Sequence, residues 1–285
     1  MPATRFGLST HLFHSRRLTR EDLVHVAAHE FEMIELFATR SHFDYRDMSA
    51  AIELREWLSD TRLELHSVHA PIMEAMRDGH WVGSCSIAAA DETKRRAAVA
   101  EVQAALAIAS SIPYRYLVLH IGVPADKAGP GDNQPDAARR SVIEIVEAAA
   151  RVNVGVALEV MPNPLSGAEG LVHTIEDQLD GLDVGVCLDY GHAHLMTDLT
   201  EAIETLSGHL WTTHVHDNHG KRDEHLVPYA GTINWDEAMM ATQKIGYEGA
   251  LMFEVTSGAA DPIDVLKRIT RARERLAETF VGFSW

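Results

Sequence analysis

Short apolar runs recur along the whole chain, and a segment of helical periodicity follows each of them. The runs span six to eight residues, are rich in β-branched residues, and are hydrophobic at nearly all positions. Near-continuous hydrophobicity of this kind is typical of strands buried on both faces of a parallel sheet. We therefore expect eight strands, at Arg5–His11, Met33–Ala38, Leu63–Ala70, Tyr116–Gly122, Gly155–Val160, Val184–Tyr190, Leu210–Asp217 and Gly249–Val255.

The segments between these runs predict amphipathic helices. In the first of them Thr19 stands at the N-cap position, and Leu23, Val26 and Ala27 share one face. The same plan is repeated seven times. The expected helices are Thr19–His29, Ser49–Leu58, Asp91–Ser110, Pro135–Arg151, Gly170–Leu179, Leu199–Ser207, Asn234–Ile245 and Asp261–Thr279.

Eight strand–helix units in 285 residues, without a long linker, predict one α/β domain. We expect a single (β/α)8 TIM barrel over residues 1–285, since this fold typically takes ~250 residues. A doubly wound open sheet is the alternative, but the Gly-rich phosphate-binding turn expected after an early strand is not visible. The apolar tail Phe280–Trp285 is expected to dock on the barrel or on a second subunit.

Composition narrows the class of partner. The chain is 46% hydrophobic and 24% charged, as globular proteins are, with 25 Lys and Arg against 42 Asp and Glu and a formal net charge of −17. So acidic a surface argues against binding to nucleic acid or to anionic membranes. The two cysteines, Cys85 and Cys187, form no disulfide framework. With no leader-like apolar segment at the N-terminus and no membrane-length apolar run, we expect a cytoplasmic protein.

Polar residues gather at the ends of six successive predicted strands, where branched aliphatic residues would be usual. One such histidine alone could be a hydrogen-bonded core residue, and one buried Glu could pair with Arg. These strands, however, hold almost no Lys or Arg. A divalent cation such as Zn²⁺, Mn²⁺, Fe²⁺ or Co²⁺ would compensate all the carboxylates at once. The candidate residues are His69, His120, Glu159, Asp189, His192, His214 and Glu254, with Asp223 and His225 in the loop after the seventh strand.

Further residues near the strand ends could contact a substrate. His11, His14, His66, His194 and His216 belong to this group, and His216 shares the parity of His214 along its strand. Lys221 and Arg222 lie inside the loop that carries Asp223, so they are the candidate anion contacts. A solvated loop pair is the alternative for these two cations.

The motifs SVHAP, LVLHIG, CLDYGHAH, HVHDNHGKRDEHL and MFEV, in this order, resemble the xylose isomerase-like TIM barrels. This group includes sugar isomerases and epimerases as well as endonuclease IV, and the resemblance covers essentially the whole chain. In the isomerase branch four residues hold one divalent ion, and their counterparts here are Glu159, Asp189, His214 and Glu254. In endonuclease IV nine residues hold three zinc ions, and the resemblance gives all nine a counterpart: His69, His120, Glu159, Asp189, His192, His214, Asp223, His225 and Glu254.

The resemblance therefore implies two reactions. The first is isomerisation or epimerisation of a sugar or sugar phosphate, with one ion (Zn, Mn, Co, Fe or Mg) that polarises the carbonyl. Glu159 and Glu254 would then remove and return the proton, and His192 or His69 would stabilise the charged oxygen. His69, His120, His216, Lys221 and Arg222 would bind the substrate in this case.

The second reaction is phosphoester hydrolysis with two or three ions, in which the additional histidines and Asp223 bind metal. A metal-binding or sugar-binding protein without turnover is a third hypothesis. The long loops at residues 122–135 and 161–170 hold one Lys between them, so they offer little to a nucleic-acid backbone. We therefore favour the isomerase or epimerase, acting on a small molecule, in a protein that could form a homo-oligomer as its relatives often do.

Overall fold

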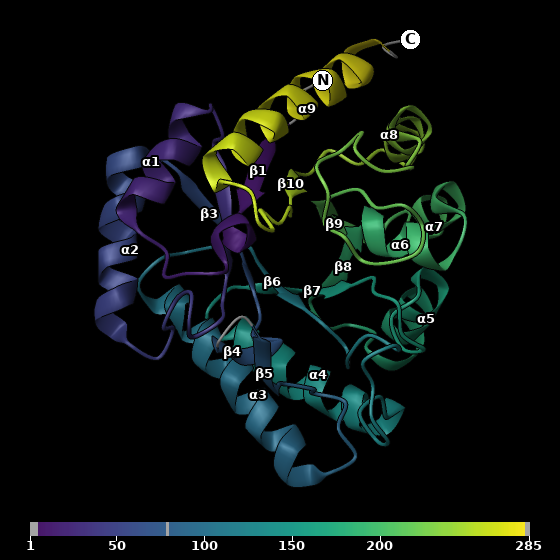
Figure 1. Ribbon diagram of the computed structural model, residues 1–285. Helices are drawn as coiled ribbons and strands as arrows, with labels where there is room; N and C mark the ends of the chain where they lie inside the picture. Colours follow the sequence, from purple (N-terminus) through teal and green to yellow (C-terminus); the bar gives the residue numbers. More distant parts are fainter. Residues whose placement is uncertain (1–4, 78–79, 283–285) are drawn as a thin grey trace.

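Eight parallel strands close into a barrel, with helices arranged around it, in the computed structural model, which describes residues 5–77 and 80–282 (Figure 1). The order around the barrel is β1-β10-β9-β8-β7-β6-β3-β2. This closed sheet confirms the predicted (β/α)8 TIM barrel and excludes the doubly wound alternative. The barrel strands are β1 (Phe6–Ser9), β2 (Met33–Phe37), β3 (Glu64–His69), β6 (Tyr116–Leu119), β7 (Gly155–Glu159), β8 (Val184–Asp189), β9 (Leu210–Val215) and β10 (Leu251–Phe253).

All eight predicted helices are present, with the expected signals at their ends. Thr19 and Asp22 form a reciprocal capping box at the start of the first helix, and Pro135 begins the fourth. The helices are α1 (Arg20–Ala28), α2 (Met48–Thr61), α3 (Glu92–Leu106), α4 (Pro135–Ala150), α5 (Ala168–Gln178), α7 (Leu199–Thr205), α8 (Trp235–Lys244) and α9 (Pro262–Gly282).

Further elements interrupt the regular alternation and were not expected. β1 ends at Ser9 rather than His11, because the chain turns into a 3-10 helix, η1 (Thr10–Phe13), capped by the Ser9 side chain. A short helix, α6 (Tyr190–Met196), follows β8 directly. An antiparallel hairpin, β4 (Met73–Arg77) and β5 (His80–Ser84), follows β3. A second 3-10 helix, η2 (Ala107–Ser110), extends α3.

The barrel interior changes in character from one end to the other. At the amino ends of β7 and β8, Gly155 and Gly185 leave room for the Trp211 ring, which occupies the space a Cβ would need. Val118, Ala157 and Cys187 form a small apolar cluster. Two residues further along β7 and β8 stand Glu159 and Asp189, and this alternation directs them to the same side as Ala157 and Cys187. We call the carboxyl end of the strands the barrel mouth.

The tail Phe280–Trp285, expected to dock on the barrel or on a second subunit, has its side chains outside the described part of the chain. Among the described residues, no helix combines the length and the apolar character needed to span a membrane.

Candidate metal centre

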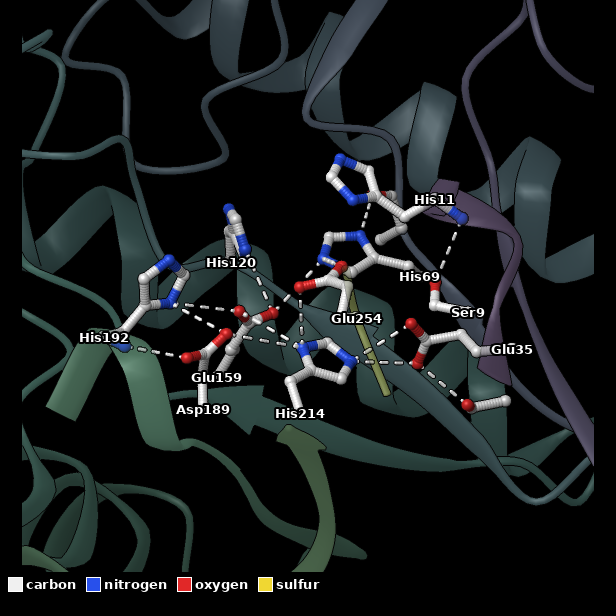
Figure 2. Close-up of polar contacts among 12 residues, drawn as sticks. Ser9, His11, Glu35, His69, His120, Glu159, Asp189, His192, His214 and Glu254 are labelled. Atoms are coloured by element: carbon white, nitrogen blue, oxygen red, sulfur yellow. Dashed lines mark hydrogen bonds and ion pairs between the residues drawn. The ribbon is translucent and has the colours of Figure 1, made fainter. Parts of the chain in front are cut away.

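Four side chains converge at the barrel mouth from four neighbouring strands (Figure 2). Glu159 ends β7, Asp189 ends β8, His214 lies in β9, and Glu254 directly follows β10. Each offers one ligand atom, and these atoms lie within 4.8 Å of one another. His214 Nδ1 lies 3.4 Å from both Glu159 Oε1 and Glu254 Oε2. We call these four residues the carboxylate set.

Two histidines approach Glu159 from β3 and from the end of β6. The Nε2 atom of His69 lies 3.2 Å from Glu159 Oε2, and that of His120 lies 3.0 Å from the same oxygen. His69 Nε2 also lies 4.0 Å from Glu254 Oε1. Glu159 is therefore the carboxylate around which the largest number of imidazoles gather.

A second group of ligands lies beside the first, formed by His192, His216, Asp223 and His225, and we call it the histidine set. Their ligand atoms also lie within 4.8 Å of one another. Asp223 Oδ2 lies 3.2 Å from His192 Nε2 and 3.1 Å from His225 Nε2. His216 stacks on His225 with 4.0 Å between ring centroids and reaches Asp189 Oδ1 at 2.9 Å. Asp189 therefore connects the two sets.

Three of these histidines are oriented by backbone carbonyls. Nδ1 of His69 donates to the Ala70 carbonyl (2.9 Å), Nδ1 of His192 to that of Val160 (3.1 Å), and Nδ1 of His225 to that of Glu254 (2.9 Å). A carbonyl only accepts, so Nδ1 carries the proton in each ring, and in the neutral ring Nε2 holds the lone pair. The three Nε2 atoms face carboxylates of the site, as in metal-ligating histidines fixed by their other nitrogen.

Several buried polar atoms of the site make no well-aligned hydrogen bond among the described residues, although some lie within ion-pair distance of one another. They include both carboxylate oxygens of Glu159, Nδ1 of His214 and Nε2 of His120. Buried polar atoms are normally hydrogen-bonded, so such a concentration at one point indicates a missing electrostatic partner. Carboxylate oxygens and imidazole nitrogens are the donors that first-row divalent metals prefer, and the residues fit such an ion.

The ionisation of the cluster agrees with this interpretation. Burial lowers the pKa of His69, but the adjacent carboxylate of Glu159, together with Glu254 and Glu35, outweighs burial and raises the pKa to about 9. Burial also lowers the pKa of His225, and Asp223 raises it to about 9. Burial raises the pKa of Asp189, whereas His192 and His216 hold it below its usual value. The carboxylates thus demand positive charge, which protonated imidazoles or a divalent cation can supply.

The nine candidate ligands that the resemblance suggested come together at the mouth. Of the other candidates, His216 joins the histidine set, and His11 stacks on His14 (4.6 Å) and lies 4.9 Å from His225. Lys221 and Arg222 are exposed in the loop between β9 and α8, where their role in anion binding stays a prediction.

Two of the weaker candidates do not reach the metal site. His66 lies toward the opposite end of the barrel, where it contacts Thr212 (3.3 Å) and the ring of Tyr116. His194 bonds instead to Thr232 at the surface.

One residue of the centre was missed. Glu35, in the middle of β2, is 0% exposed and lies 3.1 Å from His214 Nε2. The signal was available, since a single carboxylate interrupts the apolar run MIELF. It was overlooked because it does not stand at the end of its strand.

Comparison with known proteins places the chain among barrels of this kind. A family model described as xylose isomerase-like TIM barrel matches residues 23–277. An uncharacterised protein of Methanocaldococcus jannaschii is 28% identical over 261 residues, which are 88% of this chain and 83% of that protein. A solved D-tagatose 3-epimerase-like protein has a TM-score of 0.77 at 24% identity, covering 98% of this chain and 97% of its own. The IOLI protein with a zinc atom has a TM-score of 0.77 at 16% identity, covering 99% and 100%.

Proposed function

Because the chain belongs to the xylose isomerase-like TIM barrel family, we propose that it is a divalent-metal-dependent isomerase or epimerase of a small sugar or sugar phosphate. The observation that carries this proposal is the carboxylate set, whose ligand atoms lie within 4.8 Å of one another at the barrel mouth. Similarity to a D-tagatose 3-epimerase-like protein and to a zinc-containing barrel supports the same reaction class. Glu159, Asp189, His214 and Glu254 would hold the ion.

A bound divalent ion would supply Lewis acidity, which polarises the sugar carbonyl and acidifies the neighbouring C–H. The protein must then move the proton. Glu254 meets its nearest imidazole nitrogens at 3.4, 3.6 and 4.0 Å, whereas His120 lies 3.0 Å from Glu159. Glu254 is therefore the less constrained carboxylate, and we assign it the removal of the proton and Glu159 its return from the other side.

Imidazoles beside the two carboxylates would stabilise the oxygen that becomes negatively charged. His69 Nε2 lies 3.2 Å from Glu159 and 4.0 Å from Glu254, so it faces the space between the acid and the base. His192 also stands beside Glu159; its Nδ1 donates to the Val160 carbonyl, so Nε2 is the ring nitrogen that would face the charged oxygen when the ring is protonated. Hydrogen bonds aimed at a developing oxyanion are a major source of rate enhancement.

Proton exchange tests this proposal even when the product is unidentified. The protein is incubated in D2O with a panel of ketoses, including D-tagatose, and deuterium at the carbon beside the carbonyl is measured by NMR. We expect exchange that depends on added metal, about one ion per chain by elemental analysis, and a loss of about 10²- to 10⁴-fold in Glu254→Gln with the fold retained. The exposed Glu248→Gln is the matched control. Undiminished exchange in Glu254→Gln would remove the role assigned to Glu254.

A second candidate function is favoured by the histidine set, which a one-ion isomerase does not require. Its three imidazoles and one carboxylate offer a complete further metal site within 4.8 Å. Phosphoester hydrolysis with two or three ions would use it to activate water and stabilise the leaving oxygen. Two to three ions per chain, together with hydrolysis of a phosphodiester and no deuterium exchange, would replace the isomerase with this hydrolase.

A further inference from the structure

We infer that Glu35 is a positioning residue for the metal ligand His214, and that Ser67 holds Glu35 in place for this task. The inference rests on the proposed function, because it assigns His214 to a metal ion. It adds two residues to the centre that the ligand sets do not contain: Glu35, which lies outside the sequence motifs, and Ser67, the first residue of the motif SVHAP.

The contact crosses the inside of the barrel. Glu35 lies in β2 and His214 in β9, and β1 and β10 stand between these strands in the barrel order. His214 Nε2 lies 3.1 Å from each carboxylate oxygen of Glu35, and Ser67 Oγ donates to Oε2 at 2.8 Å. Glu35 and Ser67 are register partners on β2 and β3, which brings them to the same face. All three residues are 0% exposed.

This contact determines which nitrogen of His214 can bind a metal. An ionised carboxylate can only accept hydrogen bonds. Nε2 of His214, which faces Glu35, therefore carries the proton, and Nδ1 holds the lone pair in the neutral ring. Nδ1 faces three carboxylates, at 3.4 Å from Glu159, 3.4 Å from Glu254 and 3.8 Å from Asp189. Figure 2 shows His214 between Glu35 on one side and these carboxylates on the other.

Glu35 also differs in kind from the groups that orient the other histidines. His69, His192 and His225 are fixed by neutral carbonyls, whereas His214 is fixed by a carboxylate. A carboxylate hydrogen-bonded to one ring nitrogen makes the other nitrogen a stronger metal ligand, and its negative charge adds to the attraction for a cation. Since Glu35 is fully buried and faces the ring nitrogen of His214 that points away from the other carboxylates, it acts through that ligand and does not touch substrate.

The test compares metal binding in Glu35→Gln, Glu35→Asp and Ser67→Ala, with the buried Ser141→Ala as a matched control. Mn²⁺ dissociation constants are measured by competition with a chelator, and the nitrogen shifts of His214 are recorded by NMR on the Zn²⁺-loaded protein. We expect Glu35→Gln to weaken Mn²⁺ binding about 10- to 100-fold. The shorter Glu35→Asp keeps the charge but withdraws from His214, so it should weaken binding as well. Ser67→Ala should have a smaller effect in the same direction, and Ser141→Ala none.

The inference would be overturned if Glu35→Gln folds, binds Mn²⁺ with the wild-type dissociation constant and leaves the nitrogen shifts of His214 unchanged. If Glu35→Gln does not fold, the decision passes to Glu35→Asp and Ser67→Ala, and wild-type affinity in both has the same consequence. The NMR pattern separates positioning from a structural role, because a residue needed only for stability would leave the protonated nitrogen of His214 unaltered. A wild-type protein that binds no metal defeats the proposed function itself. Normal metal binding and exchange in all variants defeats only the role of Glu35.

Discussion

The burial of His42, at the rim of the barrel mouth, predicts how the free energy of unfolding changes with pH. Its Nδ1 donates to the Arg16 carbonyl at 2.7 Å, and its own carbonyl accepts from Leu18 N at 3.0 Å, so it connects the segment before α1 to the segment after β2. Its Nε2 is buried without a hydrogen-bond partner among the described residues. Protonation would place a charge there with nothing to accept the new N–H. Burial accordingly lowers the pKa of His42 to about 4.

The direction of the effect follows from the lowered pKa. In the unfolded chain the His42 ring titrates near 6.5. Between pH 6.5 and 4 the ring is therefore mostly protonated in the unfolded state and mostly neutral in the folded state. The contribution of His42 to stability is therefore complete above pH 6.5 and is lost as the pH falls toward 4. At pH 5 the folded ring is about one-tenth protonated and the unfolded ring is almost fully so. Integrated from pH 7 to pH 5, the loss is about 2 kcal/mol.

The assay is urea unfolding of wild type and His42→Asn at pH 7 and pH 5, with metal removed from both proteins. Asn can keep a donor near the Nδ1 position but does not titrate, and its constant cost cancels when the two pH values are compared. The other histidines are the same in both proteins, so their effects cancel as well. We expect wild type to lose about 2 kcal/mol more than the variant between pH 7 and pH 5. The exposed His173→Asn is the control. Equal losses in wild type and His42→Asn would refute the reasoning.

Two further predictions separate the metal sites from each other and the mouth from the opposite end of the barrel. The first changes Asp223 and His225 to Ala. The metal content should stay the same if one ion occupies the carboxylate set, and it should fall if the histidine set also holds an ion. Elemental analysis of the purified variant would decide between the two. Gly185→Ala should destabilise the fold by about 1 to 3 kcal/mol, because its Cβ would overlap the Trp211 ring, while Mn²⁺ affinity at the mouth is retained. If the free energy of unfolding in urea is the same for this variant as for wild type, the Trp211 ring can move aside for the added Cβ and the prediction is wrong.

The regular part of the barrel could be predicted because each strand and helix carries its own periodic pattern. Residues 155–158 of β7, for example, are apolar at consecutive positions, and the alternation of such runs with eight helical segments predicted the parallel barrel. The same reasoning located the candidate ligands at strand ends, since in a parallel barrel all these ends meet. The eight strands and the convergence of the strand-end candidates follow from this one regularity, whereas Asp223 and His225 lie in the loop after β9.

The remaining features depend on side-chain hydrogen bonds rather than on hydrophobic periodicity. α6 begins where Asp189, at the end of its strand, also caps the helix by accepting from the backbone N–H of His192 at 2.7 Å. The loop that carries Asp223 is shaped by Asp217, which accepts from the backbone of Tyr229 and Ile233 and from the Trp235 ring. These hydrogen bonds leave no hydrophobic periodicity in the sequence from which they could be predicted. Glu35 was missed for the same reason, because its partner His214 lies 179 positions away in the chain.

The charges at the mouth connect the number of ions to the class of substrate. Glu35, Glu159, Asp189, Asp223 and Glu254 carry five negative charges when all are ionised, and with neutral imidazoles one divalent ion leaves the centre strongly negative. Such a centre repels a phosphate group placed beside the ion, so of the two proposed substrate classes it favours an uncharged sugar over a sugar phosphate. Three ions would reverse the sign and would attract a phosphoester. Metal binding releases protons from the histidines, so the number of ions and the protonation of these rings together set the charge that a substrate meets. Metal stoichiometry is therefore measured together with the preference for charged or uncharged substrates.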